Sequence, residues 1–331
     1  MPIKELLEEI ESDISDIKNQ IFDYRETENV PSVHDASLTF ESGEAKYGKI
    51  INTYVLFVDI RNSVELNRKH HTQTMGRIYS SFAKSILKIA KYHKGSVRNI
   101  IGDRVMVVFP SENCFKNAVD CAVSINHSQK IMRNKFKDVD INYGIGIDYG
   151  ELKVIKVGLR RKGIENFDNK NLVWVGYPAN IASRLTDIAN KTIKTQMVEV
   201  NYYPYNYGSL FSDLGLGSGI FGMSQSIQPS KKIFLDNPTK KFHTLEDFGK
   251  SINYDNILGI TYSNGKLIDF KKIEHKIKYE PILMTEAVYN GLKKEDPERN
   301  SIKKNLWTKI TDHNIKNVNS TIYEGNIIWI I

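Results

Sequence analysis

Two aspartates in the sequence are placed where they could bind a divalent metal ion. Asp59 ends an apolar, β-rich run, and Asp103 lies in a Gly-Asp turn between two later runs of the same kind. Paired carboxylates near a triphosphate suit Mg²⁺ or Mn²⁺, which bind through one or two carboxylates plus phosphate oxygens. A strand-ending Asp and a turn Asp are also common without any metal, so spacing alone leaves both interpretations open.

A second pair, Asn180 and Arg184, is separated by four residues in a segment with helical spacing. That spacing puts both side chains on one face of a helix. Without further context, a helix-capping Asn and a surface Arg would be the ordinary explanation. We refer to these two residues below as the Asn/Arg pair.

The elements that position these residues follow the order β-α-β-β-α-β. This order predicts an α+β, ferredoxin-like core, in which an antiparallel sheet carries helices on one face and brings Asp59 and Asp103 together. A strand at 172–175 and a helix at 177–190 are expected to follow. The predicted core elements are strands at 53–60, 96–100 and 104–109, helices at 72–93 and 112–134, and a hairpin of strands 139–146 and 152–157 around Asp148.

The N-terminal residues 1–25 predict a helix with an apolar seam. Six seam residues are spaced by 4, 3, 4, 3 and 4 positions, with charges between them: Ile3, Leu7, Ile10, Ile14, Ile17 and Ile21. Such a helix packs on its own domain or dimerises with a parallel copy, and the pattern does not decide between these. Residues 26–49 have the composition of a linker, and the core domain is expected to cover 50–191.

The C-terminal half is less informative. Residues 192–278 are expected to be an insertion of unknown role, and the Gly-rich stretch within 202–222 is interpreted as a loop because no strand and helix bracket it. Residues 279–331 are expected to complete the core domain. The elements predicted there are a strand (ILMT), a helix at 286–292 and a terminal strand (NIIWII) at 326–331.

Composition limits the class of protein. The 331 residues carry a net charge of +7, but the basic residues are dispersed and no aromatic-basic ladder occurs, so we expect no nucleic-acid partner. No run approaches a membrane span and no secretory signal is evident, which predicts a cytoplasmic protein without a membrane partner. Cys114 and Cys121 fall on one face of a predicted helix and are expected to be structural.

Three sequence segments closely resemble the signature segments of class III nucleotidyl cyclases. They are VLFVDIRNSVEL, NIIGDRVMVVF and WVGYPANIASRL, in this order, and they lie within residues 54–190. The resemblance implies two divalent metal ions, Mn²⁺ or Mg²⁺, as cofactors and a nucleoside triphosphate as substrate. The implied reaction is attack of the ribose 3′ oxygen on the α-phosphorus with loss of pyrophosphate, giving a 3′,5′-cyclic nucleotide.

The resemblance also assigns roles to individual residues. Asp59 and Asp103, with the carbonyl of Ile60, correspond to the metal ligands. Phe57 corresponds to a position beside the nucleotide, and Ser63 supplies a hydroxyl near the phosphates, where the helix start contributes backbone N–H groups.

The Asn/Arg pair has the catalytic roles in this resemblance. Asn180 orients the ribose, and Arg184 stabilises negative charge in the transition state. Because family sites combine metal aspartates of one chain with an Asn/Arg pair of the other, the resemblance implies a homodimer with two shared sites.

The positions that select the base depart from the family's purine patterns. Asn99 stands where adenylyl members have Lys and guanylyl members have Glu, and Val173, beside Trp174, stands where Asp, Thr or Cys is expected. An amide can donate and accept, so Asn99 suits a pyrimidine edge, while Trp174 or Tyr54 could narrow the pocket. Asn99 does not distinguish CTP from UTP, since its amide can flip.

These departures most resemble the pyrimidine cyclases of bacterial Pycsar anti-phage systems, whose product, cyclic CMP or cyclic UMP, activates a separate effector protein. The alternatives are an adenylate or guanylate cyclase with an unusual pocket, and a catalytically inactive cyclase-like dimerisation module. Intact metal aspartates and an intact Asn/Arg pair favour an active enzyme.

Overall fold

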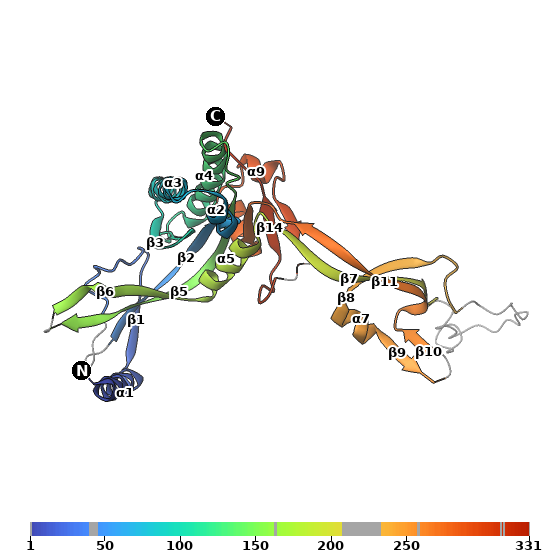
Figure 1. The fold of residues 1–331 in the computed structure, drawn as a ribbon, viewed down its shortest axis with the longest axis horizontal. Helices are drawn as coiled ribbons and strands as arrows, with labels where there is room; N and C mark the ends of the chain where they lie inside the picture. Colours follow the sequence, from blue (N-terminus) through green and yellow to red (C-terminus); the bar gives the residue numbers. More distant parts are fainter. Residues whose placement is uncertain are drawn as a thin grey trace, which may run out of the picture. The chain divides into compact units, whose positions relative to one another are not determined.

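The structure is a computed structural model and describes residues 2–39, 46–161, 164–206, 233–256, 259–311, 313 and 315–330. The chain divides into two compact units, Met1–Lys191 with Lys278–Ile331, and Thr192–Ile277 (Figure 1). The Gly-rich stretch GLGSG lies outside the described residues. Each unit is described separately below.

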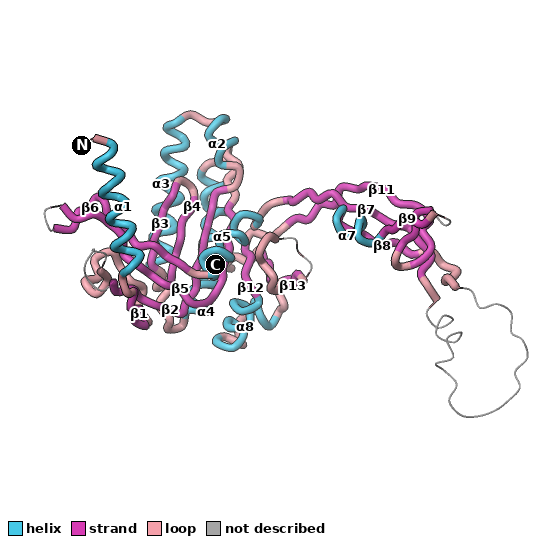
Figure 2. The backbone as a smooth tube through the Cα atoms, turned by 90° about the horizontal axis from the view of Figure 1, so that it is seen from below, coloured by secondary structure: helices cyan, strands magenta, loops and turns pink. Residues whose placement is uncertain are grey.

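The larger unit contains a nine-stranded sheet whose central strands have the ferredoxin-like order. Across the sheet these strands are β5, β2, β4 and β3, each antiparallel to its neighbour (Figure 2). The predicted fold class is therefore confirmed. The elements of this core are β2 (Lys46–Ile60), α3 (Thr72–Tyr92), β3 (Ser96–Ile101), β4 (Arg104–Val108), α4 (Cys114–Lys135) and β5 (Tyr143–Arg161).

The two faces of this sheet are covered by different helices. Because side chains alternate along a strand, Leu56 and Val58 of β2 enter a core shared with α3 and α4, whereas Val55 packs in a second cluster with Ala182 of α5 (Tyr177–Ile188). A Cβ added at Gly146 of β5 would lie 2.2 Å from the Ala182 carbonyl oxygen, so α5 approaches the sheet closely there. The expectation that helices cover one face only is wrong.

The predicted helices and cysteine environment agree with the structure. Cys114 and Cys121 are buried on α4 and are free thiols. The predicted hairpin at 139–157 is wrong, since β5 runs through residue 148 without reversing and pairs with β2 from Tyr143, opposite Ile60, to Val154, opposite Lys49. Its partner β6 (Ile164–Val175) is longer than the predicted strand and antiparallel to it.

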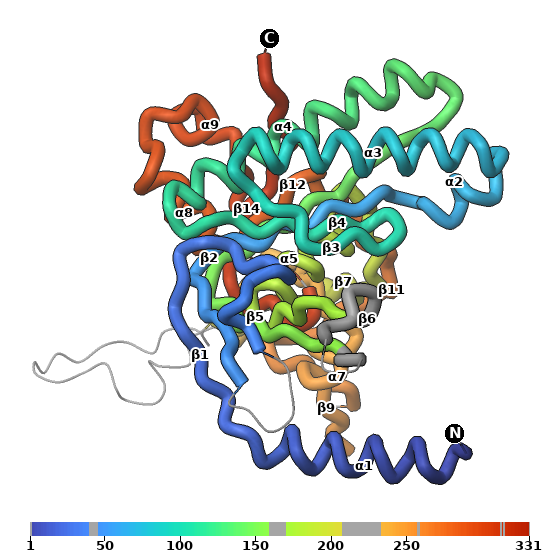
Figure 3. The backbone as a smooth tube through the Cα atoms, turned by 90° about the vertical axis from the view of Figure 1, so that its left-hand side faces the viewer, coloured from blue at the N-terminus to red at the C-terminus, as the bar shows by residue number. Residues whose placement is uncertain are grey.

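The N-terminal helix α1 (Ile3–Asn19) exposes its apolar seam. No residue of α1 is buried, and its seam residues from Ile3 to Ile17 are 42 to 70% exposed. Figure 3 shows the course of α1 at the N-terminal end of the chain. After it, β1 (Phe22–Glu26) pairs in parallel with the start of β2. The predicted linker is thus too long at its end, because Lys46–Lys49 are already strand.

The C-terminal segment of the larger unit extends the sheet. It contains β12 (Ile282–Thr285), which is parallel to β5, and α8 (Glu286–Glu295), as predicted. The terminal strand predicted at 326–331 is wrong, because 326–330 has no strand and is held to α4 by side-chain hydrogen bonds, such as that from Trp329 Nε1 to Ser124 Oγ at 2.8 Å. The remaining elements are α9 (Asn300–Lys303), β13 (Thr308–Ile310) and β14 (Ile322–Gly325).

The smaller unit has its own five-stranded sheet and a small core. The strand order is β8-β7-β11-β10-β9. Its elements are β7 (Thr192–Pro204), β8 (Thr239–Thr244), α7 (Leu245–Ser251), β9 (Ile252–Asp255), β10 (Gly259–Tyr262) and β11 (Gly265–Lys278). Its buried cluster consists of Val198, Val200, Tyr202, Phe248 and Tyr262. In the described parts of both units, no helix is long and apolar enough to cross a membrane.

Candidate active site

The structure brings the two predicted metal-binding aspartates together. Asp59 ends β2, and its partner across the β2–β4 ladder is Arg104, the residue that follows Asp103. The tight turn that presents Asp103 uses Gly102 at a φ of 60°, a conformation that glycine adopts without steric cost. Burial, and next the nearby negative charge of Asp103, raise the pKa of Asp59. The carboxylates are thus close enough to repel each other.

Two arginines contact Asp59, and sequence reasoning missed both. Arg104 Nη2 lies 3.1 Å from Asp59 Oδ2, and Arg61 Nη1 lies 3.6 Å from the same oxygen. Arg61 is buried and also donates to the backbone carbonyl of Thr186 in α5. The available signal was their position, since each arginine follows a signature aspartate by one or two residues. Both guanidiniums oppose the rise in the pKa of Asp59.

The donor set fits a divalent cation bound together with a triphosphate. Asp59, Asp103 and the backbone carbonyl of Ile60 would hold the ion, since hard oxygen donors and mutually repelling carboxylates favour a cation. No cluster of three or more His, Cys, Asp or Glu side chains suited to a metal occurs among the described residues. Phosphate oxygens of the substrate would therefore complete the coordination.

Residues predicted to contact the nucleotide lie on neighbouring strands near this end of the sheet. Phe57 is half-buried, pairs with Met106 of β4, and Met106 in turn pairs with Asn99 of β3. Asn99 is exposed and follows a bulge in β3. Ser63 is half-buried and begins the short helix α2 (Ser63–Lys69), directly after Asn62 in the left-handed conformation.

The Asn/Arg pair lies on the outer side of α5. Asn180 is exposed, and half-buried Arg184 donates through Nη1 to the backbone carbonyl of Lys316 at 3.0 Å. Ser183 and Asp187 are the α5 residues that contact Arg104, and Asn180 lies three residues before Ser183 while Arg184 directly follows it. Among the described residues, no hydrogen bond or ion pair joins the Asn/Arg pair to either metal-binding aspartate.

Val173 is far from the aspartates within one chain. It pairs with Ile155 of β5, whereas Asp59 pairs with Gly144, so the two positions are separated by eleven residues, or up to about 36 Å, along β5. Its side chain is 39% exposed, while neighbouring Trp174 packs into the cluster beside α5.

The suggestion that Tyr54 narrows the nucleotide pocket is wrong. Tyr54 is fully buried on the α3 and α4 side of the sheet, where its ring lies 4.6 Å from that of Phe115 and 4.8 Å from that of Tyr149. Phe57, three positions later in β2, belongs instead to the cluster on the α5 side. Alternation along the strand therefore places Tyr54 on the wrong face for nucleotide contact.

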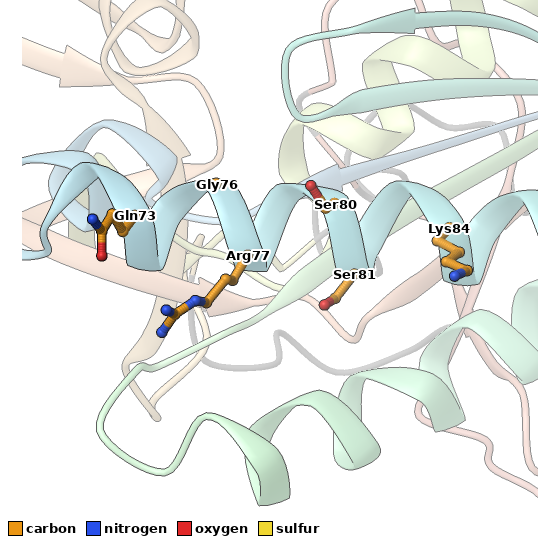
Figure 4. A pocket seen from close by; sticks show the side chains of 6 residues that line it. All are labelled: Gln73, Gly76, Arg77, Ser80, Ser81 and Lys84. Carbon is orange, nitrogen blue, oxygen red and sulfur yellow. The ribbon is translucent and has the colours of Figure 1, made fainter.

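A surface hollow of about 590 Å³ lies along α3 and is unrelated to this site. Its lining residues belong to the face of α3 opposite the core, and none is a predicted site residue. They are Gln73, Gly76, Arg77, Ser80, Ser81 and Lys84 (Figure 4). Small Gly76 and Ser80 between longer side chains account for the hollow.

Comparison with known proteins agrees with this geometry. Residues 46–202 match the adenylate and guanylate cyclase catalytic domain family. A uridylate cyclase of Burkholderia cepacia is 30% identical over 176 residues, which cover 51% of this chain and 72% of the relative. The chain therefore belongs to the class III nucleotidyl cyclase family.

Two further relatives are similar over more than half of this chain. A uridylate cyclase of Gulbenkiania mobilis is 27% identical over 205 residues, covering 58% of this chain and 75% of the relative. A uridylate cyclase of Rhodovulum sp. is 25% identical over 191 residues, covering 55% of this chain and 74% of the relative.

Proposed function

We propose that the chain is a pyrimidine nucleotidyl cyclase that converts UTP, with CTP as the second choice, to the 3′,5′-cyclic monophosphate and pyrophosphate. The observation that carries this proposal is the 30% identity to a uridylate cyclase over 176 residues, which cover 72% of that relative. Asn99 and Val173 add support, because neither matches the adenine or the guanine pattern. UTP is preferred because the similar relatives above bear that name.

The chain's residues have distinct roles in the proposed reaction. Asp59, Asp103 and the Ile60 carbonyl would hold two Mn²⁺ or Mg²⁺ ions, which when bound would neutralise charge on the triphosphate and lower the pKa of the attacking hydroxyl. The ribose 3′ oxygen forms a bond to the α-phosphorus, the bond to pyrophosphate breaks, and the hydroxyl proton passes to solvent. Asn180 orients the ribose, and the Arg184 guanidinium stabilises charge that develops on the phosphorus oxygens.

The remaining proposed contacts surround the nucleotide. Phe57 lies beside it, while the Ser63 hydroxyl and the start of α2 face the phosphates. Asn99 hydrogen-bonds the pyrimidine edge, and Val173 closes the base pocket with an apolar surface. The exposed position of Asn99 leaves its amide free to adopt either orientation toward a base.

The active form is proposed to be a homodimer with two shared sites. The exposure of Asn180 and the hydrogen bond of Arg184 to the Lys316 carbonyl support this, since among the described residues no hydrogen bond or ion pair joins the Asn/Arg pair to the two aspartates of the same chain. The exposed seam of α1 supports a parallel helix pair in the same dimer. In that arrangement Asp13 precedes an a position and Lys18 follows a d position, so opposite charges face each other across the pair.

The direct test is product identification with each of the four nucleoside triphosphates. The purified chain with Mn²⁺ should yield cyclic UMP as the main product, and Asp59→Asn should yield none above background. Dominant cyclic AMP or cyclic GMP would contradict the pyrimidine assignment. Dominant cyclic CMP would retain the enzyme class and move the preference to CTP.

We further propose that the product activates a separate effector protein in anti-phage defence. The support is the resemblance of the signature segments to the cyclases of such systems. Cells expressing the chain together with an effector protein that binds the cyclic product should resist phage, and this protection should disappear with Asp59→Asn. Equal phage titres with and without the active cyclase would contradict the defence role and leave the chemistry untouched.

A further inference from the structure

Arg104 connects the metal-binding carboxylate to the helix of the Asn/Arg pair. Its Nη2 lies 3.1 Å from Asp59 Oδ2 and also donates to Asp187 Oδ1. Its Nη1 donates to Ser183 Oγ at 3.0 Å. Ser183 and Asp187 are four residues apart on one face of α5, so a single guanidinium joins the end of β2 to this helix.

The pairing of β2 with β4 places Arg104 beside Asp59. Arg104 is directly opposite Asp59 in the β2–β4 ladder, so the register of two central strands keeps the two side chains adjacent. The side chain is 30% exposed, whereas Arg61, the other arginine on Asp59, is 3% exposed and bound to a helix carbonyl. Arg104 can therefore break its ion pair with Asp59 and still be partly solvated, whereas Arg61 would remain as a buried charge without its carboxylate partner.

We propose that Arg104 is an internal cation that competes with a divalent metal ion for Asp59, and that Asp187 sets the strength of this competition. The proposal rests on the metal site in the proposed function. When a metal ion binds, the guanidinium gives up Asp59 and keeps Asp187 and Ser183. Metal binding at β2 then changes how α5 is held, and α5 carries the Asn/Arg pair that serves the other site of the dimer.

The test is Mn²⁺ binding to the full chain without nucleotide, measured by titration calorimetry. Arg104→Gln should tighten binding by roughly three- to tenfold, the size of one partly exposed charge pair. Asp187→Asn should weaken binding, because the guanidinium then has one carboxylate partner fewer and remains on Asp59. Opposite signs are diagnostic, since a purely structural role would make both substitutions weaken binding.

The double variant isolates the role of Asp187. If Asp187 acts through Arg104, Asp187→Asn should have no effect on Mn²⁺ affinity once Arg104→Gln is present. If it weakens binding equally in both backgrounds, Asp187 acts directly on the metal ion and this part of the proposal is wrong. Lys250→Gln removes an exposed cation of the smaller unit, which pairs with Glu246 at 2.6 Å, and should leave Mn²⁺ affinity unchanged.

Failure of this proposal can be told apart from failure of the metal site. Asp59→Asn should abolish the Mn²⁺ binding of the wild-type chain. If wild-type binding survives Asp59→Asn, or is absent both without nucleotide and with a 3′-deoxynucleoside triphosphate that cannot cyclise, the metal site is wrong, and the competition with it. If Asp59→Asn abolishes binding but Arg104→Gln leaves it equal or weaker while thermal unfolding is unchanged, only the role of Arg104 is wrong.

Discussion

Asp59 and Arg184 are two charged groups proposed to act on the same nucleotide, and the fold treats them differently. Asp59 is mostly buried, next to Asp103, and contacts two guanidiniums of its own chain. Arg184 is half-buried on the outer side of α5, where a backbone carbonyl accepts its hydrogen bond. The difference teaches that one half of the site is assembled within the chain, while the other half faces outward and, in the proposed dimer, serves the site of a second copy.

The largest expected effect comes from inactivating the two halves of the site in separate chains. Asp59→Ala and Arg184→Ala should each lower cyclase activity by at least about a hundredfold, because each removes charge stabilisation at the reacting phosphate. Mixing the two variants should restore about a quarter of wild-type activity, since half of randomly formed dimers are mixed and each has one intact site. Activity is measured as cyclic nucleotide formed per chain.

The control for this experiment mixes two variants of the same half. Asp59→Ala with Asp103→Ala should restore nothing, because every site then lacks one metal ligand. Recovery in that control would show that the two aspartates of one site come from different chains. No recovery in the first mixture, although mixed dimers form, would show that each site is built from a single chain.

The central fold could be predicted from sequence because its signals are local. The apolar run ending at Asp59 and the Gly102–Asp103 turn specify two neighbouring strands, and their pairing brings the carboxylates together. The hairpin at 139–157 was predicted wrongly for a related reason. Its Asp-Tyr-Gly sequence is typical of a turn, but pairing with β2 along its length keeps β5 extended.

The arginines and the sheet faces could not be predicted in the same way. Whether Arg61 and Arg104 contact Asp59 depends on the β2–β4 register and on α5 packing across the sheet, and both are long-range contacts. The face to which Tyr54 points depends on which helices cover which side, and the spacing of β2 alone does not give that. Residue roles at one end of a strand are thus more predictable than the partners that surround them.

Asp148 is a second buried carboxyl group, and it contacts the Thr285 hydroxyl, whereas Asp59 contacts two guanidinium groups. Asp148 lies in β5, accepts a hydrogen bond from Thr285 Oγ1 at 2.6 Å, and burial raises its pKa to about 6. Since this pKa exceeds the ordinary value of 3.8, the stability that Asp148 contributes is present below pH 4 and is lost as pH rises through 6. The loss amounts to about 3 kcal/mol at most.

Asp148→Asn should therefore raise the thermal unfolding midpoint of the larger unit at pH 7.5 and leave it unchanged near pH 4. An amide oxygen can still accept from Thr285, and the amide carries no charge to bury. Asp138→Asn is the matched control, because Asp138 is exposed, and it should have little effect at either pH. A variant that is less stable than wild type at pH 7.5 would show that the Asp148 charge is compensated by its surroundings.

The smallest expected effect concerns how the two halves meet. If α1 pairs with its copy, Ile10→Glu places a charge in the apolar seam and should raise the dissociation constant of the dimer by roughly tenfold, without removing any group from the site. Ser12→Glu makes the same change in charge on the opposite face of α1 and should leave the dissociation constant as it is. Sedimentation velocity across a range of concentrations measures both. Equal dissociation constants for the two variants would mean that the cyclase core alone brings Arg184 to the partner's aspartates and that the α1 seam serves another contact.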